Sequence, residues 1–225
     1  MELPREVPVM ILPNATLFPQ ALLPLYIFEP RYRRMLAECL ESHRMFCVAM
    51  QRPGSTREAP APVAGLGVVR VSVEHHDSTS HLILQGLARV QLHETIRYKP
   101  YRKNRIELLR PPPCNTVAVD ALVGRLKDLL EERVKLGLPF PFPVAPEPDA
   151  ESGKLGGISA AEVLKHLGAI ENAEHLTDLV SCAVLPDAGE RQTILETVEV
   201  DTRLRRLIHF LLADLRRHRK TSSNE

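Results

Sequence analysis

Alternation of apolar and polar residues marks most of the first half of the chain. In a half-buried strand every second side chain faces the core, so this pattern predicts strands. Val69, Val71 and Val73 are the clearest case, with polar residues between them. Gly86 interrupts a later run and allows a bulge or a close bend there. Short apolar runs predict strands at residues 8–12, 22–28 and 45–50, and the later expected strands lie at residues 69–73, 82–92 and 106–108.

A helical period occurs once in the first half and dominates the second half. Pro30 suits the first turn of a helix, where its missing N–H would have had no partner. After three stiff prolines at 111–113, apolar residues recur every three or four positions. Ser159 with Glu162 resembles a capping box, and Asp187 is expected to cap a later helix. The expected helices of the second half lie at residues 119–130, 159–167, 176–180, 194–195 and 204–215.

The change of period divides the chain into a β-rich front and a helical back, which predicts an α+β fold. A small barrel or coiled sheet is expected at 1–112, a helical bundle at 113–220 and a disordered tail at 221–225. Within the bundle, residues 138–157 form a long loop rich in proline. Loops longer than about 12–15 residues are commonly functional or disordered.

Composition excludes several classes of function. Lys and Arg number 29 and Asp and Glu 28, so a net charge of +1 gives no general attraction for nucleic acid or an anionic membrane. No apolar run reaches the roughly 18–20 residues of a membrane span, and the first residues lack the pattern of a secretory signal. The cysteines are scattered, which favours free buried thiols and a cytoplasmic location. They are Cys39, Cys47, Cys114 and Cys182.

Two motifs near the amino terminus resemble the Lon protease amino-terminal domain, of the peptidase S16 Lon-domain family. Residues 12–19 read L-P-N-A-T-L-F-P, and residues 23–33 read L-P-L-Y-I-F-E-P-R-Y-R. Residues 84–90, L-Q-G-L-A-R-V, and the leucine-rich run at 176–215 extend the resemblance. It implies a pseudo-barrel of about six strands with one helix, joined to a helical bundle. Gln20 stands where a glycine is usual, and Tyr26 where histidine is common.

The resemblance covers the module that this family uses to engage polypeptides. Full Lon proteases add an ATPase and a serine–lysine protease, but no G-x-x-x-x-G-K-[ST] is present, which predicts a stand-alone, non-enzymatic domain. Ser152 and Lys154 lie in a polar loop without a visible catalytic framework. No cofactor or metal is expected, since a solvated turn explains His75, His76, Asp77 and His81 better than a metal site does.

Eight residues are candidates for contact with a polypeptide. Apolar side chains beside a strand edge suit a ligand that offers apolar groups and unpaired backbone. The arginines that follow Glu29 could grip a peptide carboxylate, although solvated arginines at a helix start fit the pattern as well. Alternatively, the prolines set corners between strands while the aromatic residues fill the core. The candidates are Leu17, Phe18, Leu22, Leu23, Arg31, Arg33, Phe140 and Phe142.

The sequence therefore predicts a binding module for apolar or unfolded polypeptide segments, with a protease or chaperone as a further partner. An alternative is a sensor or regulatory module that binds a small molecule or one specific protein. A membrane is not an expected partner. Nucleic acid is not expected either, because the basic run at 216–220 also suits the carboxyl end of a helix.

Overall fold

The chain divides into two compact units, residues 1–110 and 111–225. The computed structural model describes residues 3–55, 58–138 and 160–222. The proline-rich loop with Phe140 and Phe142 therefore lies outside the described residues, as does Ser159 of the expected capping box. The last helix extends to Ser222, two residues into the segment expected to be a disordered tail.

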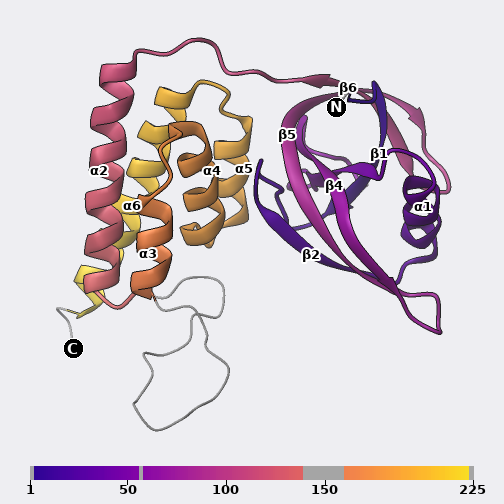
Figure 1. Cartoon of the computed structure of the whole chain (residues 1–225), viewed down its shortest axis with the longest axis horizontal. Helices are drawn as coiled ribbons and strands as arrows, with labels where there is room; N and C mark the ends of the chain where they lie inside the picture. The colour runs from indigo at the N-terminus through magenta and orange to yellow at the C-terminus, as the bar shows by residue number, and fades with distance from the viewer. Residues whose placement is uncertain (1–2, 56–57, 139–159, 223–225) are drawn as a thin grey trace, which may run out of the picture. The chain divides into compact units, whose positions relative to one another are not determined.

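The described residues of the first unit form a six-stranded sheet with one helix, and Figure 1 shows this sheet beside α1. The strand order is β2-β5-β4-β3-β1-β6, and a further pairing of β5 with β6 closes five of the strands into a ring. Among the described strands, β1 and β3 pair in parallel, and the other pairs are antiparallel. The elements are β1 (Glu6–Leu12), β2 (Leu22–Ile27), α1 (Pro30–Leu40), β3 (Met45–Met50), β4 (Val63–Glu74), β5 (Ser80–Arg97) and β6 (Arg102–Leu108).

The unbroken apolar character of β1 and β3 follows from burial on both faces. Alternate side chains of each strand enter two different apolar clusters. Phe46 packs with Met35 of α1 in one cluster, and Cys47 packs with Leu66 in the other. Since both faces of these strands are covered, no polar alternation is needed along them. The same reason explains why β4 begins six residues before the expected alternation at Val69.

Three glycines of β4 and β5 make room for the connection between β1 and β2. A Cβ atom on Gly65 would lie 1.9 Å from the Leu17 carbonyl oxygen, and one on Gly86 would lie 1.9 Å from the Phe18 carbonyl oxygen. At Gly67 a Cβ atom would meet the Leu17 and Leu84 side chains at 2.7 and 2.6 Å. This close approach places Leu17 in the core. The register of β4 against β5 shifts between Leu66 and Gly67, next to Gly86, in agreement with the bulge that was one of the two expectations there.

Gln20 holds a backbone conformation that side chains rarely adopt. Its φ is +66°, in the left-handed region, while its N–H donates to the Gly86 carbonyl oxygen at 2.9 Å. That region favours glycine because a Cβ atom is crowded there. The departure from the glycine that is usual after L-F-P therefore falls at a strained position.

In residues 111–138 and 160–222, the second unit is a bundle of five helices. Asparagine or aspartate caps three of them: the side-chain oxygens of Asn115, Asn172 and Asp187 each accept a bond from a backbone N–H three residues on. The cap at Asp187 confirms the sequence expectation, and α6 begins at Val200, four residues before the expected stretch at 204–215. The helices are α2 (Thr116–Lys135), α3 (Ala160–Gly168), α4 (Ala173–Val184), α5 (Ala188–Glu196) and α6 (Val200–Ser222).

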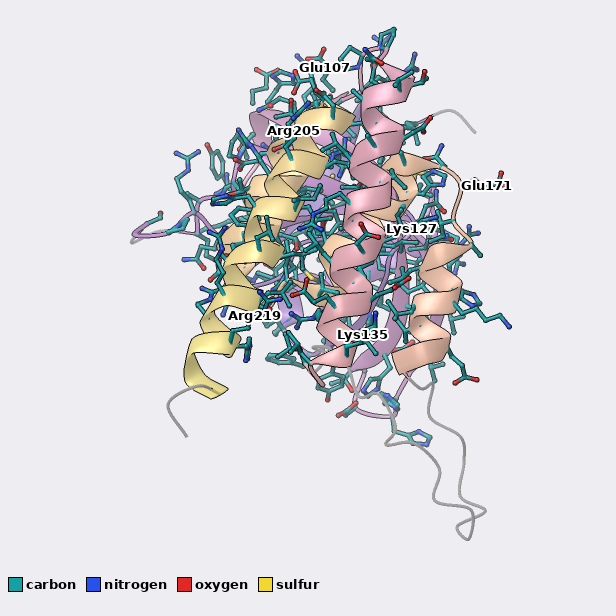
Figure 2. The ribbon with its side chains drawn as sticks, turned by 90° about the vertical axis from the view of Figure 1, so that its left-hand side faces the viewer. Glu107, Lys127, Lys135, Glu171, Arg205 and Arg219 are labelled. Atoms are coloured by element: carbon teal, nitrogen blue, oxygen red, sulfur yellow. The ribbon has the colours of Figure 1, made fainter. Side chains whose placement is uncertain are left out.

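The long helices α2 and α6 lie side by side in this unit (Figure 2). Figure 2 shows Lys127 and Lys135 along α2 and Arg205 and Arg219 along α6. Lys127 Nζ donates to the Gly168 carbonyl oxygen at the end of α3 at 3.0 Å. The exposed polar side chains thus join helix ends and neighbouring helices, while the leucine stripes face inward.

Two arginines are buried inside the bundle with acidic partners. Arg203 is fully buried, bonds Asp178 at 2.9 Å, and donates to the carbonyl oxygens of Thr197 and Val198. Arg133 of α2 pairs with Asp214 of α6. Removing one member of such a pair leaves the other charge buried without a partner, which destabilises the fold. These pairs therefore fix which helices pack together.

Replacing Gly86 by alanine should destabilise the first unit severely. The new methyl group would overlap the Phe18 carbonyl oxygen, so strand or connection must move, and we expect a loss of about 3 kcal/mol in the free energy of unfolding. Gly124→Ala on exposed α2 is the control, since nothing lies within 4 Å of its Cβ position and alanine should add about 1 kcal/mol. Urea denaturation followed by circular dichroism measures both. Equal stability of the two variants would refute the close approach.

Replacing Gln20 by glycine should stabilise the first unit. Relief of the left-handed strain, about 1–2 kcal/mol, exceeds the extra unfolded-state entropy of glycine, about 0.5–1 kcal/mol. We therefore expect a gain of about 0.5–1 kcal/mol, measured as a higher urea midpoint with an unchanged denaturant slope. A glycine at Gln51, which has no positive φ, should lower the midpoint instead.

Candidate functional site

Strand β2 lies at an edge of the sheet in the first unit. The long strand β5 pairs with β2 through residues 80–85 and with β6 through residues 90–97. On its other side β4 accompanies it over almost its whole length. Beyond the ring, β2, β5 and β4 therefore form a three-stranded sheet, and in the described part of the chain no strand pairs with the outer edge of β2.

One face of this three-stranded sheet is apolar and exposed to solvent. Tyr26, His81 and Val73 lie directly opposite one another across the three strands. Leu22 is 61% exposed and Tyr26 48%, while Val71 and Val73 are each 54% exposed. We name this surface the β2–β5–β4 patch. It consists of Leu22, Pro24, Tyr26, Val71, Val73, His81 and Ile83.

The patch contains an open groove with an aromatic end. The groove measures about 360 Å³ and its lining is almost entirely apolar. Tyr26 stacks on His81 with ring centroids 4.7 Å apart and on Phe28 at 5.7 Å. Phe28 is itself 58% exposed. Large apolar side chains gathered on one exposed face mark an interaction site more often than isolated ones do.

Backbone groups of β2 face outward beside the groove. The Ala21 carbonyl oxygen accepts a bond from Gly86 N–H at 2.9 Å. Bonding residues alternate along an antiparallel ladder, so Leu22, Pro24 and Tyr26 turn their backbone groups away from β5. Pro24 suits this orientation because it has no N–H to donate to the sheet. The edge thus offers three carbonyl oxygens and two N–H groups.

The structure corrects two of the predicted contact residues and supports the exposure of another. Leu17 and Phe18 are almost fully buried, because the glycines of β4 and β5 admit them to the core, so the expectation that Leu17 lies on a surface groove is wrong. Leu22 is exposed, whereas Leu23 faces the core and is half-buried. Whether Leu22 and Leu23 contact a ligand stays a prediction.

The predicted arginines lie apart from the groove lining and one is already occupied. Arg31 bonds Glu29 at 2.8 Å and forms a two-pronged pair with Glu58. Arg31 holds the pKa of the Glu58 carboxyl below its usual range, and Glu58 in turn raises the pKa of Arg31. A peptide carboxylate would have to displace Glu58 to reach this guanidinium. Arg33 is half-buried.

Sequence reasoning missed Val71 and Val73 as surface residues. The register of β4 against β5 shifts between Val69 and Val71, which leaves Arg70 as the extra residue of a bulge. A one-residue shift moves every later side chain to the opposite face of a strand. Val69 is therefore buried, whereas Val71 and Val73 point to solvent. The polar turn that begins after Glu74 was the available signal that this end of the strand leaves the core.

The remaining candidate chemistry is sparse. In residues 3–55, 58–138 and 160–222 no three His, Cys, Asp or Glu side chains gather in a way that could hold a metal ion. Burial raises the pKa of the Cys39 thiol to about 12 and also raises that of Cys47, so both are inert at neutral pH. Cys114 is exposed, contrary to the expectation of four buried thiols. Among the described helices, none is both long and apolar enough to cross a bilayer.

Comparison with known proteins identifies the family. A family model described as the ATP-dependent protease La (LON) substrate-binding domain matches residues 6–213. The chain is 24% identical to the Lon protease of Dictyoglomus thermophilum over 217 residues, 95% of this chain and 25% of that protein. It is 28% identical to the Lon protease of Anaeromyxobacter dehalogenans over 216 residues, 93% and 23%. The chain spans about a quarter of the length of these curated relatives.

Solved structures show the same fold. The N-terminal domain of Mycobacterium avium complex Lon protease matches with a TM-score of 0.68 at 15% identity, covering 92% of this chain and 97% of that one. A Lon N-terminal domain protein from Xanthomonas campestris matches with a TM-score of 0.61 at 17% identity, covering 91% and 98%. The fold is that of these Lon N-terminal domains. The chain belongs to the Lon substrate-binding domain family, which confirms the resemblance and the α+β fold.

Proposed function

We propose that the β2–β5–β4 patch binds apolar, extended polypeptide segments and leaves them chemically unchanged. The observation that carries the proposal is an exposed apolar sheet face next to an open strand edge. An unfolded segment brings apolar side chains and unpaired backbone groups together, and this surface suits both. The family description supports the same class of ligand.

Binding of one short peptide is expected to be weak. Covering apolar surface contributes about 25 cal/mol per Å², but ordering a flexible chain costs free energy for every residue that it immobilises. A groove of about 360 Å³ accommodates only a few side chains. Weak single contacts suit a module that samples many clients and holds those with several apolar segments.

Strand addition at β2 supplies the second part of the proposed contact. A segment that pairs with the free groups of Leu22, Pro24 and Tyr26 continues the sheet by one strand. Every second side chain of that segment then lies level with the patch, and cross-strand pairs with Leu22 and Tyr26 contribute about 0.2–1 kcal/mol each. Backbone pairing makes the contact tolerant of sequence, and the patch selects apolar residues.

We further propose that the domain hands bound segments to a separate protease as a non-catalytic adaptor. The curated relatives are Lon proteases in which the matching region is about a quarter of the protein. Degradation of an unfolded client by a Lon-type protease, followed on gels with and without this chain, tests that role. An unchanged rate, with client binding intact, would remove the adaptor function only.

Charge in the patch should weaken binding. Leu22→Asp with Tyr26→Ser removes apolar surface and places a carboxylate where a client side chain would lie, so we expect about a tenfold or larger loss of affinity for a denatured client protein. Ile96→Asp is the matched control, because Ile96 is exposed on the far part of β5 and does not line the groove. Fluorescence anisotropy with a labelled, permanently unfolded client measures all three proteins.

The Ile96→Asp control shows whether the loss of affinity is specific to the patch. Circular dichroism must show that each variant keeps the wild-type fold, which their exposed positions favour. Equal losses for the patch variant and Ile96→Asp would show that binding is general to the surface. Retention of one tight peptide motif by the patch variant would favour the alternative of a module for one specific partner.

Backbone methylation of the ligand should distinguish strand addition from side-chain contact alone. An alternating apolar peptide can be N-methylated at its even or its odd amides. In a strand only one of these sets faces β2, so one methylated peptide should lose about tenfold in affinity while the other keeps most of it. If both bind like the parent peptide, strand addition is wrong but contact with the patch stands.

A further inference from the structure

Two histidines meet at the tip of the β4–β5 hairpin. His75 Nε2 and His81 Nδ1 lie 2.7 Å apart, and the rings meet edge to face with centroids 4.9 Å apart. His81 is opposite Val73 in the ladder, so His75, two residues further on, lies on the same face and diagonal to it. Both side chains are exposed. The turn that sequence reasoning took as merely solvated thus brings two imidazole nitrogens together.

The turn between the two histidines holds them in place. His75 N–H donates to the Thr79 carbonyl oxygen at 2.8 Å, and Ser78 N–H donates back to the His75 carbonyl oxygen at 2.9 Å. The Asp77 carboxylate accepts bonds from the backbone N–H and the hydroxyl of Thr79 at 3.0 and 2.7 Å. On the other side, the His81 ring stacks against Tyr26. The backbone of the turn and the His81 ring are therefore restrained before a ligand binds.

We propose that His75 and His81 bind a divalent transition-metal ion in adjacent coordination positions. Imidazole nitrogen is a preferred ligand for zinc, copper and nickel. At metal–nitrogen distances of about 2.0–2.1 Å, two nitrogens are about 2.9 Å apart at a right angle and about 3.4 Å apart at the tetrahedral angle. The separation of 2.7 Å is nearer the first value. The pair therefore favours Cu²⁺ or Ni²⁺ over tetrahedral Zn²⁺, and copper most by its general affinity order.

Metal binding requires a change of tautomer and a turn of the two rings. The present contact needs a proton on one of the two facing nitrogens and a lone pair on the other, so these nitrogens now point at each other. When the donor ring moves its proton to its other nitrogen and the exposed rings turn, both lone pairs can face one metal ion and no net charge is lost. The chain supplies two ligands, and water completes the coordination. Because the Asp77 carboxylate is already held by Thr79, it stays a support of the turn.

Copper and nickel titrations of the untagged full chain test the site. Isothermal titration with Ni²⁺ should show one site, and Cu²⁺ electron paramagnetic resonance should show hyperfine structure from two nitrogens. His75→Gln and His81→Gln should each weaken Ni²⁺ binding by about a hundredfold, because the second ligand acts at a high effective concentration. Their Cu²⁺ spectra should lose one nitrogen.

His93→Gln is the matched control, because His93 lies exposed on the same strand and pairs with Glu107. It should bind Ni²⁺ like the wild type. Wild-type affinity in His75→Gln or His81→Gln, or an equal loss in His93→Gln, would overturn the site. Circular dichroism excludes misfolding as the cause, and Zn²⁺ bound more tightly than Ni²⁺ would contradict the proposed geometry. None of these readouts depends on polypeptide binding, so the two proposals stand or fall separately.

Discussion

The packing of Leu17 and Phe18 against three glycines is the constraint on which the first unit depends. The Leu17 and Phe18 carbonyl oxygens occupy the space that a Cβ atom on Gly65 or Gly86 would need. The connection after β1 therefore runs directly across β4 and β5, and Leu17 fills the core beside Met10 and Leu84. A close-packed interior leaves no room for an added methyl group at such a crossing. Leu17 and Phe18 can therefore pack in the core only while these three positions are glycine.

That crossing also sets where β2 begins and how it pairs. Gln20 N–H and the Ala21 carbonyl oxygen both bond the backbone of Gly86, so the first contact of β2 with β5 is made where the connection leaves the core. From this point the ladder continues with Leu22 opposite Gln85 and ends with Ile27 opposite Ser80. Side chains alternate along β2, so this register alone decides that Leu22 and Tyr26 face solvent. The patch is thus a consequence of core packing several residues away.

Most elements of the fold follow from local pattern, whereas the site does not. A short apolar run located β3, and a capping residue type located the cap at Asp187, because those signals depend only on neighbouring residues. The bulge at Arg70 left no comparable trace, since it arises from pairing with β5, and it reversed the faces of Val71 and Val73. The prediction for Leu17 was wrong for a related reason, because the burial of its side chain depends on glycines about fifty residues away in the sequence. The same holds for Arg203, whose sequence neighbours do not reveal the buried Asp178 on α4.

An exposed apolar face beside an open edge carries a risk of self-association, and β2 shows how that risk is limited. A second copy pairing along β2 would need an unbroken set of donors, but Pro24 removes the central one and its ring projects at the edge. In the proposed binding mode, an isolated client segment would use the three carbonyl oxygens and the two flanking N–H groups. Strand β2 therefore disfavours long, regular pairing with a second copy of the chain but still allows pairing with a short segment. Aromatic side chains, an unpaired strand edge and a central proline occur together on β2. This combination favours a binding surface over a packing defect.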